Sequence, residues 1–84
     1  MIHTEFLYQF DTDHLLQSAA ELPIQACIGM DLFDEKTSRQ MKIVGLYYRI
    51  ESARLVCDVE FTDDLGELSL EFLLATGWID LCAD

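Results

Sequence analysis

The stretch MKIVGLYYRI, residues 41–50, followed after ESA by RLVCDVEFT, residues 54–62, decides the fold. Apolar and polar residues alternate through 54–62, which is the period of a strand with one buried face. The row expected to face inward consists of Leu55, Cys57, Val59 and Phe61. Because residues 51–53 turn the chain between the two segments, the sequence predicts a pair of antiparallel strands.

The first of these segments differs from the second because both of its faces are apolar. One row holds Met41, Ile43, Gly45 and Tyr47, and the other holds Val44, Leu46, Tyr48 and Ile50. Such a strand lies at the centre of a sheet or gives one face to a partner. Since 84 residues are too few to cover both faces, we expect a surplus apolar surface here, and with it a homodimer or a binding face.

The N-terminal part of the chain predicts a strand followed by a helix. Residues 1–10 alternate loosely, as a strand does. The helix is predicted over residues 13–22, because Asp11 or Thr12 supplies an N-cap and Pro23 prevents continuation. Its apolar stripe would consist of Leu15, Leu16, Ala19, Ala20 and Leu22.

Residues 24–33 return to a period of two and predict another strand, which the polar residues 34–40 connect to the central pair. The last third of the chain, residues 63–76, fits either a fifth strand or a helix. The helix fits better because a capping aspartate precedes it, and Gly77 is placed as a left-handed stop with Trp78 folding back. Residues 78–84 would add a short strand or an extended segment.

Together these elements predict a single domain spanning 1–84 of the α+β class, in the order β-α-β-β-β-α. A three-stranded antiparallel sheet of residues 24–33, 41–50 and 54–62, joined by 1–10, would be covered on one face by two helices. The chain length allows only one hydrophobic core.

Composition narrows the function to protein binding. The chain is 51% hydrophobic yet carries a formal net charge of −11, which excludes direct attraction to nucleic acid or to anionic lipid. Its apolar runs are too short to cross a bilayer, and the N-terminus lacks the features of a signal peptide, so a cytoplasmic location is expected. The expected partner is a larger protein with a basic surface.

The charges divide along the chain into three blocks. Residues 1–35 hold seven acids and no Lys or Arg, residues 36–54 hold all five basic residues and one acid, and residues 55–84 hold eight acids and no Lys or Arg. The acidic blocks therefore predict a negative surface. The alternative is that acids near helix starts only stabilise the helix dipole, while the remaining acids keep the protein soluble.

The predicted binding residues are the acids of the last block together with an adjacent pair of tyrosines. They are Asp58, Glu60, Asp63, Asp64, Glu67, Glu71, Tyr47 and Tyr48. Of the two tyrosines, one is expected to face the core and the other to be exposed, because neighbours on a strand face opposite sides.

Catalytic and metal-binding patterns are not expected to have a role. Cys27, Cys57 and Cys82 lack the paired spacing of metal or redox sites and are predicted to be reduced and buried. His14 follows Asp13, but adjacent helical residues do not face each other, so a surface histidine is expected. We expect no cofactor, no metal and no enzymatic activity.

In length, acidity, lack of motifs and expected α+β fold, the chain resembles phage-encoded inhibitors of bacterial defence, namely the anti-CRISPR and anti-restriction proteins that mimic DNA. The resemblance implies a non-enzymatic inhibitor that binds a nucleic-acid-binding surface of its target. Two alternatives remain: an immunity protein or antitoxin against a basic nuclease toxin, and a homo-oligomeric adaptor module.

Overall fold

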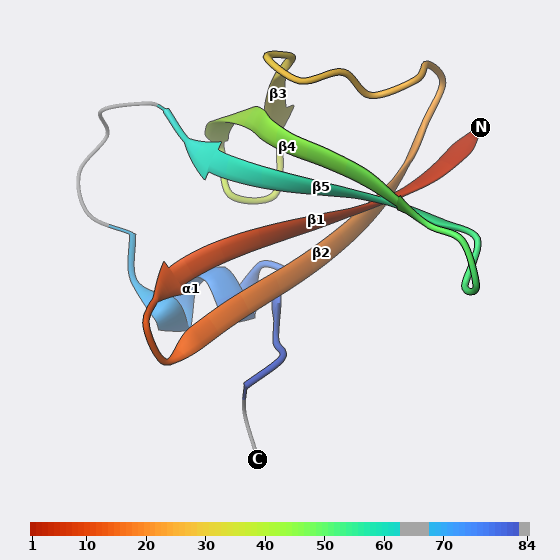
Figure 1. The fold of residues 1–84 in the computed structure, drawn as a ribbon. Helices are drawn as coiled ribbons and strands as arrows, with labels where there is room; N and C mark the ends of the chain where they lie inside the picture. Colours follow the sequence, from red (N-terminus) through yellow and green to blue (C-terminus); the bar gives the residue numbers. More distant parts are fainter. Residues whose placement is uncertain (63–67, 83–84) are drawn as a thin grey trace.

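The computed structural model describes residues 1–62 and 68–82 and shows one six-stranded mixed sheet with a single short helix in that part of the chain (Figure 1). The sheet order is β3-β4-β5-β1-β2-β6. The elements are β1 (Ile2–Asp11), β2 (His14–Leu22), β3 (Asp31–Asp34), β4 (Arg39–Arg49), β5 (Arg54–Phe61), α1 (Leu70–Ala75) and β6 (Ile79–Asp80). The predicted α+β class with two helices is therefore wrong, because the protein is mostly β.

The predicted central pair of strands is confirmed as the antiparallel pair β4 and β5. Its register contains a bulge, because Ile43 pairs with Val59 while Gly45 pairs with Asp58. The extra residue, Val44, shifts the alternation of β4, since one inserted residue moves all later side chains to the other face. Leu46 and Tyr48 therefore share the face of Ile43, which corrects the two rows predicted from strict alternation.

The predicted helix over residues 13–22 is wrong, because this segment forms β2. It pairs with β1 along nearly its whole length, from Asp11 opposite His14 to Ile2 opposite Leu22. In the turn between the strands, the side chain of Asp11 accepts a hydrogen bond from the backbone N–H of Asp13 at 2.8 Å. This aspartate stabilises a hairpin turn instead of capping a helix, and pairing with β1 overrides the helix-like apolar spacing.

The sheet is mixed and not purely antiparallel, because β1 lies parallel to β5. The register places Glu5 opposite Val56 and Leu7 opposite Asp58. At the other side of the sheet, β6 adds two residues to the edge of β2, pairing Ile79 with Gln17. The prediction of a short strand in the C-terminal segment is thus confirmed.

Only the last part of the strand predicted over 24–33 forms, as β3. Gly29 has a φ angle of +90° and interrupts the extended backbone before it. The preceding loop still contributes to the core, because Ala26 is 1% exposed. Backbone hydrogen bonds from Gly29 and to Met30 tie the loop to Ile43 of β4.

The C-terminal helix is confirmed but short. Ser69 is the N-cap of α1, and its side chain accepts a hydrogen bond from the N–H of Phe72 at 3.1 Å. The predicted caps Asp63 and Asp64 lie outside the described residues, as does Glu67. Gly77 has a φ angle of +104° and reverses the chain, so that the N–H of Trp78 bonds the carbonyl of Leu73.

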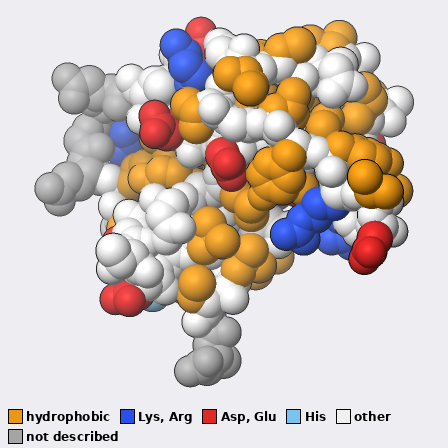
Figure 2. Space-filling model, in the orientation of Figure 1, with side chains coloured by type: hydrophobic (Ala, Val, Ile, Leu, Met, Phe, Trp, Pro, Cys, Tyr) orange, Lys and Arg blue, Asp and Glu red, His pale blue; other side chains and the backbone are white. Residues whose placement is uncertain are grey.

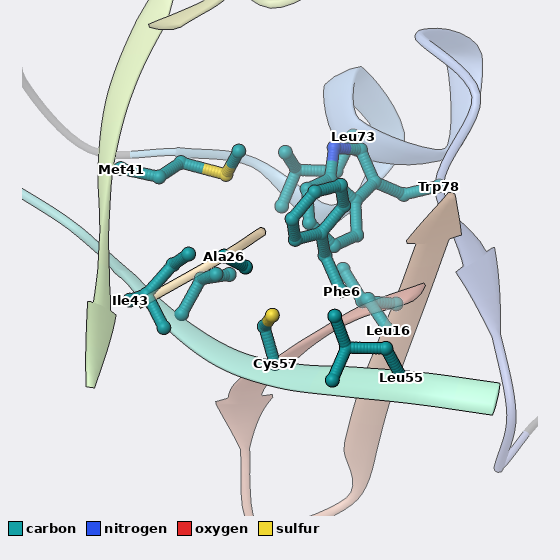
Figure 3. Packing of buried hydrophobic residues seen from close by; sticks show 10 residues of the cluster. Phe6, Leu16, Ala26, Met41, Ile43, Leu55, Cys57, Leu73 and Trp78 are labelled. Carbon is teal, nitrogen blue, oxygen red and sulfur yellow. The ribbon is translucent and has the colours of Figure 1, made fainter. Parts of the chain in front are cut away.

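The core lies between the sheet and the layer formed by α1 and the loop before β3 (Figure 3). Leu73 from α1 and Leu16 from β2 are fully buried, and Trp78 is 3% exposed. Tyr8 and Phe61 pack edge-on at a centroid distance of 4.7 Å. The indole N–H of Trp78 is buried and has no hydrogen-bond partner among the described residues. The six-residue helix is too short to be stable in isolation. It is held by the burial of its Leu73 side chain in this core and by the hydrogen bond from the N–H of Trp78 to the carbonyl of Leu73.

No helix within the two described ranges has both the length and the apolar character needed to cross a bilayer.

Candidate interaction face

The sheet has one face that no described element covers. The α1 helix lies behind the sheet in Figure 1, so Figure 2 views this uncovered face, which we call the open face. We define it by the outward residues of the central strands: Glu5 and Leu7 of β1, Leu15 and Gln17 of β2, Val44 and Tyr47 of β4, and Arg54, Val56, Asp58 and Glu60 of β5. None of these belongs to the core cluster on the other side.

The centre of the open face is a polar network around Glu5. Its carboxylate side chain is only 8% exposed. Arg54 donates a hydrogen bond from Nη1 to Glu5 Oε1 at 3.0 Å, and Gln17 donates one from Nε2 to the same oxygen at 2.7 Å. Because three neighbouring strands supply these residues, the network links β2, β1 and β5 across the sheet.

Apolar side chains surround this network. Val56, beside Glu5, is 2% exposed, whereas Val44 and Tyr47 of β4 are 43% and 41% exposed. A depression with a volume of 340 Å³ is bordered by Leu7, Leu15 and Val44 together with acidic residues of β5. Apolar area next to carboxylates, with no layer above it, is typical of a surface that binds another protein.

The bulge in β4 brings one acid of the open face close to the backbone. A Cβ atom on Gly45 would lie 2.8 Å from Oδ2 of Asp58 and 3.2 Å from its Cβ. Glycine at this position therefore leaves room for the Asp58 side chain against the strand. A larger residue at this position would displace the Asp58 side chain on the open face.

The structure brings together only some of the predicted binding residues. Asp58 and Glu60 are exposed on the open face together with Tyr47. Tyr48 lies on the opposite, core-facing side, so the two tyrosines divide between the faces as expected, but Tyr48 is also exposed, at 57%. Glu71 is exposed on α1, which covers that opposite side. The remaining predicted acids, Asp63, Asp64 and Glu67, lie outside the described residues.

Basic residues lie close to the acids of the open face. Lys42 is directly opposite Glu60 in the β4–β5 register, and its Nζ is 3.9 Å from a carboxylate oxygen of Asp31. Arg54 contacts Glu5, as described above. In Figure 2 the acidic side chains are scattered among hydrophobic ones and do not form a row. The sequence blocks of charge therefore mix when the strands pair.

Sequence reasoning missed Leu15 and Gln17 because it predicted a helix where β2 forms, and it missed Glu5 and Leu7 because the parallel pairing of β1 with β5 was not predicted. A signal was present in the strand patterns. Leu7 breaks the polar row of β1, and Val56 breaks the polar row of β5. Each of these apolar residues stands in a row that is expected to face solvent. Such exceptions on two strands indicate that the strands are adjacent and that their outward faces form a second apolar surface.

Among the described residues, three ionisable groups outside the Glu5 network have shifted pKa values. The hydrogen bond that His14 Nδ1 donates to the Asp80 carboxylate, 2.7 Å from Oδ2, raises the pKa of His14 above its usual 6.5. Burial raises the pKa of Tyr8, with a further contribution from the charge of Glu60. Burial likewise raises the pKa of the Cys57 thiol. His14 thus pairs with a residue of β6 and is not an isolated surface histidine.

The cysteines are free, but their predicted burial is correct only for Cys57. Cys27 in the loop before β3 and Cys82 after β6 are exposed. The predicted strand over residues 24–33 included Cys27, and the predicted C-terminal segment over 78–84 included Cys82. Both cysteines lie outside the strands that form.

Comparisons of the chain with protein-family models, with curated proteins and with solved structures found no match.

Proposed function

We propose that this protein is a small, acidic, non-enzymatic regulator that binds a basic surface of a larger protein through its open face. The observation that carries the proposal is an uncovered sheet face on which apolar residues such as Val44 and Tyr47 surround exposed Asp58 and Glu60. Burial of the apolar residues would supply affinity, and the carboxylates would select a basic partner.

The net charge of −11 supports the basic character of the partner, because a field of this sign attracts cationic surfaces over a Debye length of roughly 8 Å at physiological salt. The resemblance to phage-encoded inhibitors makes a nucleic-acid-binding protein of bacterial defence the first candidate for that partner. Inhibition would follow from occupying its nucleic-acid-binding surface.

The spacing of the acids favours contact with a protein surface over imitation of a phosphate backbone. Carboxylates two residues apart on a strand are about 6.7 Å apart, whereas one DNA strand carries a charge every 3.4 Å. The neighbouring strands do not fill the gap, because Gly45 lies opposite Asp58 and Lys42 lies opposite Glu60. The carboxylates therefore act as separate contact points within an apolar face.

The proposal is tested by capture from an extract of the source cells with three immobilised baits: the wild type, a double variant of the open face and a matched control. The open-face variant carries Asp58→Lys and Glu60→Lys. The control carries Glu51→Lys and Glu71→Lys, which make the same charge change at two exposed positions outside the open face, in the turn between β4 and β5 and on α1. A basic protein retained by the wild type and the control but lost from the open-face variant is the expected result.

The proposal is contradicted if both double variants lose the captured protein equally, or if the wild type retains no protein with a basic surface. Sedimentation of the isolated protein tests the alternative of a homo-oligomeric adaptor. A dimer that the open-face variant abolishes would show that a second copy covers this face.

A further inference from the structure

A second surface lies where β2, near one edge of the sheet, approaches β3 at the other edge. Residues 18–22 of β2 and residues 32–36 of β3 and its following turn line one groove of 520 Å³, although three strands separate β2 from β3 in the sheet order. The floor of the groove is apolar and includes Phe6, Met41 and Trp78. The strong curvature of the sheet thus leaves an opening between its edges.

The β2 side of this opening is an incomplete strand edge. Within the described residues β6 pairs with β2 only at Leu16 and Gln17. The carbonyl of Leu15 accepts a hydrogen bond from the N–H of Leu81, so its backbone groups point away from β1. Because backbone direction alternates along a strand, Ala19 and Glu21 also point their N–H and C=O groups outward, beyond the end of β6.

Backbone groups that have no partner among the described residues and lie beside an apolar groove are the features that bind an extended segment by strand addition. An added strand would continue the line of β6. Its side chains would alternate between the groove floor and the side of the sheet on which Ala19 and Glu21 project. The side chains that face the groove floor therefore have to be apolar, because they contact Phe6 and Met41.

The charges around the groove determine which side chains of the added strand are favoured on the side of Ala19 and Glu21. Glu21 is exposed on the free edge, where its carboxylate contacts His3 at 3.1 Å, and Asp34 and Glu35 line the opposite rim together with Lys36. A basic side chain next to Glu21 would form a cross-strand pair of opposite charge. A second copy of this chain is disfavoured, since its own net charge is −11.

We infer that the edge of β2 at residues 18–22 binds an extended segment of a partner protein in which apolar residues alternate with Lys or Arg. The segment pairs with the backbone of Ala19 and Glu21 and places its apolar side chains against the groove floor. This site is separate from the open face and does not depend on the function proposed for it.

The probe is a library of displayed random peptides selected on the intact wild-type protein. We expect enrichment of peptides that alternate apolar and basic residues, and slower amide hydrogen exchange at Ala19 and Glu21 when a synthetic copy of an enriched peptide is bound. Ala19→Pro removes an N–H that faces away from β1, so the hairpin ladder is preserved. It should weaken peptide binding about tenfold.

Val44→Ser on the open face is the matched control and should leave peptide affinity unchanged. Circular dichroism verifies the fold of Ala19→Pro, and methylation of single backbone nitrogens in the peptide provides the same test without altering the protein. The inference is overturned if no alternating basic peptide is enriched, if Val44→Ser weakens binding as much as Ala19→Pro, or if methylation at every peptide position has no effect.

Discussion

Replacement of Arg54 by Met is expected to destabilise the protein by about 1.5 kcal/mol. The change leaves the Glu5 carboxylate, whose side chain is 8% exposed, with Gln17 as its hydrogen-bond donor on the open face. Breaking a buried ion pair costs about 3–5 kcal/mol, whereas an exposed pair contributes about 0.2–1 kcal/mol. Because the Arg54 side chain is 53% exposed, solvent screens the pair and the expected cost lies between these limits.

A double-mutant cycle isolates this interaction. Arg54→Met, Glu5→Gln and the double variant are unfolded in urea, and the coupling free energy is expected to be about 1 kcal/mol. In thermal melts that coupling corresponds to a Tm difference of about 4–8 °C for a domain of this size. Arg49→Met is the matched control: it removes another arginine of the same two strands, paired in register with Arg54, and should change stability by less than about 0.5 kcal/mol. Additive effects of the two substitutions would refute the claim that Glu5 and Arg54 act as one unit.

Substitutions at three other positions test the core and the C-terminal segment. Leu73→Ala should cost about 3 kcal/mol in urea unfolding, because Leu73 is fully buried and joins α1 to the sheet; a cost below about 1 kcal/mol would show that the helix is not packed there. Trp78→Phe should cost less than half as much as Trp78→Ala, since Phe retains a ring and removes a buried indole N–H that has no partner among the described residues; equal costs would contradict this. The hydrogen bond from His14 to the Asp80 carboxylate, aided by the charges of Asp11 and Asp13, raises the pKa of His14, so its stabilising effect is present below about pH 6.5 and is lost as pH rises through the folded-state pKa. His14→Gln should therefore lower the urea midpoint relative to wild type at pH 6 more than at pH 9, and an equal difference at both pH values would show that the pair is not formed.

The sequence predicted the central strands because their alternation is decided locally. The inward row of β5, with Leu55, Cys57 and Val59, is buried as expected. The same reasoning failed for residues 13–22, whose apolar spacing is helix-like although the segment forms β2. Long-range pairing with β1 decides between helix and strand, and no local signal in the segment reports that pairing.

The candidate site was predictable only where its residues lie on β4 and β5. Asp58, Glu60 and Tyr47 were identified from composition and alternation. Glu5 was missed because its importance comes from Arg54, a residue 49 positions away that approaches it through parallel pairing of β1 and β5. The charge blocks of the sequence also gave too simple an expectation, since strand pairing sets Lys42 opposite Glu60.

The central claim, that the open face binds the partner, is tested most directly by photo-crosslinking from adjacent positions. A photoreactive phenylalanine analogue is placed at Tyr47 in one variant and at Tyr48 in another. The two side chains are both exposed, at 41% and 57%, but lie on opposite faces of the sheet. With the basic protein captured by the wild type, we predict crosslinking from position 47 and none from position 48. Crosslinking from position 48 alone would contradict the account.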